Sequence, residues 1–178
     1  THYAANLMSV TPKTMWPAVK AMLHSVYDQP DAASVQAQFD RLGITPRFTV
    51  TDGREGPVRV KAVKGMIVQV LENLTDNSVF WLTQQKRVEP SFKPVISVEI
   101  DPEGQNLTFT DNGPGIPVER AEDVFKPFMS TKPPGEGKGL GLYISKEIAK
   151  YHGSDLYLED APRKGRLNTF VLEITGLQ

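Results

Sequence analysis

The chain has 178 residues, enough for one domain with its own core, and its hydrophobic and charged fractions of 39% and 23% are typical of a globular protein. The formal net charge of -1 and the lack of a long basic run argue against nucleic-acid binding. The absence of cysteine excludes disulfides and thiolate metal sites. No apolar run approaches the ~20 residues of a membrane span. We expect a cytoplasmic domain that makes no membrane contact, even if a longer protein carries an anchor elsewhere.

The first 42 residues are predicted to be a tail and a helical lead-in, and residues 43–178 to form a single domain. Apolar side chains recur at helical spacing from about Pro12 to Tyr27. A second helix is expected from Asp31, a plausible cap, to about Leu42, where Gly43 ends it. The lead-in therefore contributes helices rather than strands.

The remaining chain mixes helical and strand patterns. The longest helix is predicted from about Val63 to Gln85, and a last helix from about Leu140 to Tyr151, ended by Gly153. Alternating apolar residues predict strands at 47–51, 58–60, 96–100, 107–109, 156–158 and 170–174. One apolar face per strand is typical of an antiparallel sheet covered on one side. The expected fold class is α+β, a two-layer α/β sandwich whose mostly antiparallel mixed sheet is covered on one face by helices.

The long helix carries two amides at an i, i+4 spacing. On a wheel of about 100° per residue, Asn77 falls in the middle of the apolar stripe and Asn73 at its edge. Asn77 is either a core amide bonded to the backbone or an oxygen ligand for a hard cation such as Mg²⁺. Trp81, one turn further on, either stacks on a base or packs in the core.

A first glycine-rich segment, DNGPGIP, runs from Asp111 to Pro117 at the end of a predicted strand. Glycine permits a positive φ and a close approach of the backbone to a ligand. The Asp111 carboxylate can accept a hydrogen bond from the exocyclic amine of adenine. Taken alone, the three residues DNG are also an ordinary turn sequence.

A second glycine-rich segment, GKGLGL, opens the last helix at 137–142. Unpaired N–H groups at a helix N-terminus bind phosphate. Between the two segments, Phe125 and Phe128 flank a Lys–Pro pair, and a polar loop follows that is suited to act as a lid. Lys132 in that loop either reaches a terminal phosphate or is an ordinary solvated lysine.

These motifs resemble, in their order, the N box, first glycine box, F box and second glycine box of the GHKL ATPases, which include DNA gyrase, MutL-type repair proteins, heat-shock chaperones and sensor histidine kinases. The wording FKPFMSTKP is similar to that of NtrB- and FixL-like histidine kinases. The resemblance covers about Gly43 to Ile174. It implies a Bergerat-type fold and an ATP-binding catalytic domain that uses ATP and Mg²⁺.

The resemblance also implies residue roles. Asn77 is the expected Mg²⁺ ligand, and Asn73 and Lys132 are the expected catalytic residues at the phosphates. Asp111 is expected to bind the adenine amine, with Thr169 supporting the base. The other expected nucleotide-binding residues are Trp81, Gly113, Gly115, Ile116, Phe125, Gly137, Lys138, Gly139, Leu140 and Gly141.

Two positions on the long helix bear on the reaction. Many histidine kinases carry a basic residue three positions after the metal asparagine, where this chain has Phe80, so phosphate neutralisation is expected to depend more on Lys132. Hydrolytic relatives carry glutamate where this chain has Asn73, and an amide cannot take a proton from water. We therefore expect phosphoryl transfer to a nucleophile from another domain rather than hydrolysis.

The leading hypothesis is the catalytic domain of a two-component histidine kinase, which transfers the γ-phosphate to a histidine on a dimerisation domain and works with a response regulator, as part of a homodimer. His24 and His152 lack the sequence context of a phosphoacceptor. The alternatives are an ATP-gated conformational module, an anti-sigma-like serine kinase, and a degenerate domain that binds ATP without catalysis.

Overall fold

The computed structural model of the chain describes residues 39–53, 59 and 61–174. All of them belong to a compact unit that spans Gln38–Gln178, whereas a second unit, Thr1–Ala37, lies outside the described residues. The helix predicted at 12–27 therefore lies outside them, and so does most of the one predicted at 31–42, of which residues 39–42 are helical. The expected boundary between lead-in and domain at residue 43 stays a prediction.

The main sheet has five strands in the order β1-β2-β3-β7-β5. β1 pairs with β2 in parallel, and the other neighbours are antiparallel, as the predicted fold class requires. The strands are β1 (Thr45–Val50), β2 (Val95–Asp101), β3 (Asn106–Asp111), β5 (Leu156–Leu158) and β7 (Thr169–Glu173). A separate pair joins β4 (Ile116–Pro117) to β6 (Arg166–Leu167).

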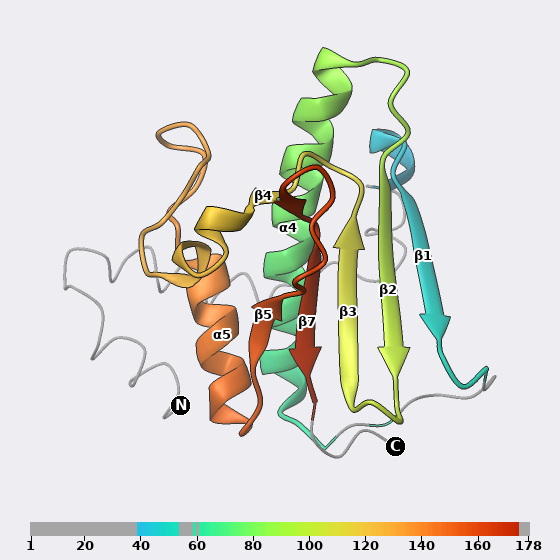
Figure 1. The fold of residues 1–178 in the computed structure, drawn as a ribbon, viewed down its shortest axis with the longest axis vertical. Coiled ribbons are helices and arrows are strands. Elements are labelled where there is room, and N and C mark those ends of the chain that lie inside the picture. Colours follow the sequence, from blue (N-terminus) through green and yellow to red (C-terminus); the bar gives the residue numbers. More distant parts are fainter. Residues whose placement is uncertain (1–38, 54–58, 60, 175–178) are drawn as a thin grey trace. The chain divides into compact units, whose positions relative to one another are not determined.

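Helices α4 (Lys64–Val88) and α5 (Gly141–Tyr151) lie side by side against one face of this sheet (Figure 1). The register explains which face they cover, because Val98, Phe109 and Phe170 stand opposite one another along β2, β3 and β7 and point to one side. The largest fully buried core side chains include Leu74, Leu82, Ile148, Leu156 and Leu172. Each contributes about 1.5–3 kcal/mol on burial, so the two-layer sandwich predicted from the sequence is confirmed.

The end of α5 is tied to the start of α4 by one side chain. His152 follows the last residue of α5, and its Nδ1 lies 2.8 Å from the carbonyl oxygen of Ile148. Its Nε2 accepts a hydrogen bond from the backbone N–H of Val63 at 3.1 Å. Gly153 has φ +69°, the left-handed stop predicted for this helix. His152 thus holds the helix pair together and does not take part in the site below.

Several short elements differ from the sequence expectations. The β4–β6 pair and the 3-10 turns η2 (Val118–Arg120) and η3 (Asp123–Phe125) were not predicted, because two or three residues are too short for a periodic pattern. The strand predicted at 58–60 is not supported at residue 59, which is irregular, while its other two residues lie outside the described ones. Within the described part of the chain, no helix has the length and apolarity needed to cross a membrane.

Candidate nucleotide-binding site

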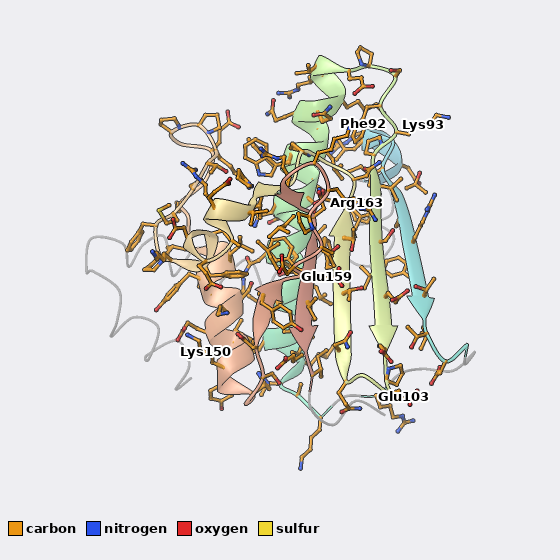
Figure 2. The ribbon with its side chains drawn as sticks, viewed as in Figure 1. Phe92, Lys93, Glu103, Lys150, Glu159 and Arg163 are labelled. Carbon is orange, nitrogen blue, oxygen red and sulfur yellow. The ribbon has the colours of Figure 1, made fainter. Side chains whose placement is uncertain are left out.

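The predicted functional segments meet at one end of the molecule. In Figure 1, the C-terminal end of β3 and the β4 segment lie in the upper half beside α4, and the loop at 129–139 rises above the beginning of α5. Figure 2 shows Lys93 at the same end and Glu103 at the opposite one. The Asn112 side chain fixes this end by donating to the carbonyl of Lys93 and accepting from the N–H of Val95, both at 2.8 Å.

Asp111 ends β3 and is held in place by two donors. One carboxylate oxygen accepts from the hydroxyl of Ser78 on α4 at 2.5 Å, and the other accepts from the backbone N–H of Gly113 at 2.8 Å. A carboxylate can accept about four hydrogen bonds. Asp111 therefore keeps acceptor capacity for a ligand while its orientation is fixed from both sides.

The first glycine-rich segment is held in place by side chains of the residues just before β7. The Asn168 amide donates to the carbonyl of Gly113 at 3.0 Å, and the Arg166 guanidinium donates to the carbonyls of Pro114 and Gly115. Gly115 has φ +68°, and a Cβ there would stand 2.6 Å from the Asn168 side chain, so only glycine fits. Next to this contact, the hydroxyl of Thr169 lies 2.9 Å from that of Thr110, the residue before Asp111, and its predicted support of the adenine stays a prediction.

The burial of Asn73 and Asn77 on the long helix differs from the prediction. The helical wheel placed Asn77 at the centre of the buried stripe, whereas Asn73 is the buried amide and Asn77 is only half-buried. The reason is that α4 packs against α5 as well as the sheet, which turns its buried face toward Asn73. The Asn73 amide donates to the carbonyl of Gly141 and to the hydroxyl of Ser145, both at 3.0 Å. Asn73 thus positions the first turn of α5, and its catalytic role stays a prediction.

Asn77 lies one turn further along α4 and fits a metal ion better. Its half-buried side chain makes no hydrogen bond to another residue in the described part of the chain. An amide oxygen that is partly shielded from water and has no protein partner is a suitable donor for Mg²⁺, which keeps waters and phosphates as its other ligands. The residues present therefore fit the predicted ion at this position.

The beginning of α5 has the features of a phosphate site. Its first turn carries no acidic residue, and no side chain caps the N-terminal N–H groups. Leu140 is buried and anchors the turn, while Gly137 and Lys138 are exposed. Free N–H groups and the positive end of the helix dipole both favour an anion here.

The root of the lid loop is fixed by aromatic and charged contacts. Phe125 is buried, packs edge-on against Phe170 at 6.2 Å, and carries the Lys146 ammonium 4.9 Å above its ring. Lys146 also bonds the carbonyl of Leu156 at 2.9 Å and pairs with Asp155 at 3.0 Å. Phe125 therefore holds the lid root against the core, and its predicted nucleotide contact stays a prediction.

The two ends of the lid touch each other. Gly139 has φ +65°, and a Cβ there would stand 2.5 Å from the carbonyl carbon of Phe128 and 2.6 Å from the carbonyl oxygen of Met129. Phe128 itself has φ +65° and is 43% exposed, so, unlike Phe125, it does not pack into the core. The backbone of 128–129 thus closes onto the second glycine box.

The side chain of Lys132 extends from the lid toward α4. Its ammonium lies 4.6 Å from the centre of the Phe80 ring, and Phe80 packs edge-on against Trp81 at 5.0 Å. Desolvation lowers the pKa of Lys132, an effect that the charges of Asp76 and Glu136 oppose. The predicted phosphate residues of the lid, the second glycine box and α4 are therefore brought together.

Sequence reasoning missed the residues that orient the site. Ser78, Ser145 and Asn168 each hold a predicted site residue, and Ser78 and Ser145 are almost fully buried. Their partners lie 33 to 72 positions away along the chain. Of the three, only Ser78 could have been found from the sequence, because a buried serine hydroxyl next to Asn77 on α4 needs a hydrogen-bond partner.

Two family models match different parts of the chain. Residues 62–176 match the model of the histidine kinase-, DNA gyrase B- and HSP90-like ATPases. Residues 1–46 match the model of the Mutator family of transposases. The two matched ranges do not overlap.

Curated relatives divide in the same way. The sensor histidine kinase ZraS of Klebsiella oxytoca is 33% identical over 123 residues, which is 67% of this chain and 24% of that protein. The sensor protein KdpD of Rathayibacter rathayi is 32% identical over 141 residues, or 77% of this chain and 16% of that protein. The transposase for insertion sequence element IS1081 of Mycobacterium tuberculosis is 69% identical over 42 residues, or 24% of this chain and 10% of the transposase. The chain thus spans a quarter or less of each of these relatives.

Solved structures agree with the kinase relatives. The catalytic domain of the histidine kinase ThkA superposes with a TM-score of 0.61 at 25% identity, covering 88% of this chain and 92% of that one. The mycobacterial sensor histidine kinase MprB gives 0.61 at 26% identity, covering 86% and 94%. Because the matched family model spans more than half of the chain and its homologues are sensor histidine kinases, the chain belongs to the histidine kinase-, DNA gyrase B- and HSP90-like ATPase family and carries the ATP-binding catalytic domain of the sensor-histidine-kinase type.

Proposed function

We propose that this domain binds Mg²⁺–ATP in the cytoplasm and transfers the γ-phosphate to a histidine on a separate dimerisation domain. The observation that carries the proposal is the fixed carboxylate of Asp111, held by Ser78 and the Gly113 amide at the same end as the uncapped start of α5. An adenine acceptor and a phosphate site at one end of the sheet define a nucleotide site rather than a simple anion site. The family match supports the same ligand.

The predicted residues other than Phe125 have a place in this scheme. Asp111 accepts from the adenine amine, and Thr169, Gly113, Gly115, Ile116 and Trp81 line the base. Lys132, Lys138, Leu140 and the glycines at 137, 139 and 141 surround the phosphates. Backbone amides orient the chain of phosphates, and the loop at 129–139 excludes water when it closes.

We assign Mg²⁺ to Asn77. Bound there, the ion would neutralise charge on the phosphates, as it does in phosphoryl transfer generally. Asn73 supports transfer over hydrolysis, because it occupies the position from which a hydrolase would activate water, and its N–H groups are used by Gly141 and Ser145. The Asn73 amide itself cannot act as a base toward water.

The phosphoacceptor comes from outside the ATP-binding domain. His24 lies in residues 1–46, which match the model of the Mutator family of transposases and lie outside the range 62–176 that matches the ATPase model. We infer that this segment is not a kinase lead-in and supplies no acceptor. The partners proposed are a histidine-bearing dimerisation domain and a response regulator, in a protein that works as a homodimer.

Phosphate transfer tests the function directly. The 178-residue chain is incubated with γ-labelled ATP and the isolated dimerisation domain of the relative ZraS. We expect acid-labile, base-stable label on that domain, none on the chain alone, and the same yield when His24→Ala replaces the wild type. ATP binding without phosphohistidine would contradict the proposal. Label that is stable to acid would point instead to a serine kinase.

Replacing Asn77 tests the metal assignment. We expect Asn77→Ala to reduce about tenfold the gain in ATP affinity that Mg²⁺ provides, about 1.4 kcal/mol, because an oxygen ligand is lost. Calorimetry with Mg²⁺ and with EDTA measures this gain, and affinity in EDTA should not change. Asn106→Ala, at the far end of β3, is the control. An equal loss with and without Mg²⁺ would place the ion elsewhere.

A further inference from the structure

Phe80 stands where a basic residue was expected, and the structure shows what occupies that space. The Lys132 ammonium lies 4.6 Å from the centre of the Phe80 ring. Phe80 is on α4, three residues after Asn77, and Lys132 is on the lid, so the contact joins segments that are 52 positions apart. A cation over the face of an aromatic ring is attracted by its quadrupole.

The path of the Lys132 side chain adds a second contact. A Cβ built on Gly137 would stand 3.0 Å from Cδ of Lys132 and 3.4 Å from its Cβ. The stem of the lysine therefore runs along the start of the second glycine box, and its charged end reaches α4. The ammonium is thus held between the segment that presents amides to the phosphates and the helix that carries Asn77.

The ring is a fixed support. Phe80 is half-buried and packs edge-on against Trp81 at 5.0 Å, so it is braced from the helix side. Lys132 is half-buried as well, and neither it nor Asp76 forms an ion pair within the described part of the chain. The charges of Asp76 and Glu136 act on Lys132, but neither carboxylate forms a salt bridge with it among the described residues, so an anionic ligand would have no such pair to break.

We propose that Phe80 is a positioning residue that holds Lys132 at the terminal-phosphate end of the site, so that the phosphate-binding cation comes from the lid instead of from α4. This rests on the proposed nucleotide-binding function. It explains how the chain can bind phosphate without a basic residue at position 80. It also makes the lid the part of the site that distinguishes a nucleotide with a third phosphate from one without. Lys132 should then discriminate ATP from ADP only while the ring holds it.

The first test uses the nucleotide-free chain. With ¹³C-labelled lysine, the ε-methylene signal of Lys132, identified by its loss in Lys132→Met, should be shifted upfield by the ring current. Phe80→Tyr should keep that shift and Phe80→Leu should abolish it. Phe48→Leu, at an exposed phenylalanine on the edge strand β1, is the control for a generic Phe→Leu effect. A shift that survives in Phe80→Leu would overturn the proposal.

The second test measures affinity for ATP and ADP by calorimetry. Phe80→Leu should weaken ATP binding about three- to tenfold, the range of a cation–π contact, and ADP binding by less than about twofold. Phe80→Tyr should restore the ATP preference, and Phe80→Leu with Lys132→Met should be no weaker than Lys132→Met alone. Equal losses for ATP and ADP, or additive effects, would show a purely structural role and refute the proposal. A wild-type chain that binds no nucleotide would refute the proposed function instead, a result that the signal in the nucleotide-free chain keeps separate.

Discussion

Replacing Asp111 by asparagine should weaken ATP binding about 10- to 100-fold while the fold is retained. The substitution keeps the shape of the side chain. Its oxygen can still accept from the Gly113 N–H, and its new NH₂ group can donate to the Ser78 hydroxyl, which can rotate to accept. What is lost is a charged acceptor facing the adenine amine, worth about 1.5–3 kcal/mol, and each 1.4 kcal/mol is tenfold in affinity.

Base preference gives this prediction a sharper readout than affinity alone. Inosine carries an oxygen where adenine carries its amine, so an NH₂ group at position 111 can donate to ITP but repels ATP. Calorimetry should show the ATP-over-ITP preference shrinking in Asp111→Asn. The control Glu103→Gln, which removes an exposed carboxylate at the opposite end of the sheet (Figure 2), should bind both nucleotides as the wild type does. An unchanged preference with unchanged ATP affinity would refute the adenine assignment.

The sheet could be predicted because a strand's alternation depends only on which face is covered. Each strand of β2, β3 and β7 was recognised in this way, and the registers place their apolar side chains together. β1 shows the limit. Phe48 points to the same side as Val98, yet it is 73% exposed, because the helices cover β3, β5 and β7 and leave the edge strand open. The alternation of apolar residues in a strand does not reveal whether that strand lies in the middle of the sheet or at its edge.

The motifs of the site were recognised from the sequence, but their mutual support was not. A helical wheel assumes one buried direction, whereas α4 packs against both the sheet and α5, and this reversed the expected burial of Asn73 and Asn77. The bonds from Ser78 to Asp111 and from Asn168 to Gly113 join segments that only the fold brings together. The sequence showed that position 80 lacks the expected basic residue. It could not show the contact between Phe80 and Lys132, because that contact depends on the path of the lid.

The path of the lid depends on the contact between residues 128–129 and Gly139. The variant Gly139→Ala tests this contact. A Cβ at position 139 would come within 2.5 Å of the Phe128 carbonyl carbon, and the φ of +65° is unfavourable for alanine. Because the contact is with backbone, no side-chain rotation relieves it, and the second glycine box must move away from 128–129. Two charge-assisted amide–phosphate bonds of about 1.5 kcal/mol each would be lost, so ATP affinity should fall about 100-fold.

Gly135→Ala is the matched control, because Gly135 has φ +90° in the same loop but no atom within 4 Å of its Cβ position. Both variants carry backbone strain of similar size, whereas only Gly139→Ala separates the ends of the lid. Calorimetry should therefore show a large loss of ATP affinity for Gly139→Ala and a small one for Gly135→Ala. Thermal unfolding should change by only a few degrees in both, because the loop lies outside the core. Equal losses of affinity would mean that loop strain, and not the contact between 128–129 and Gly139, controls the phosphate site.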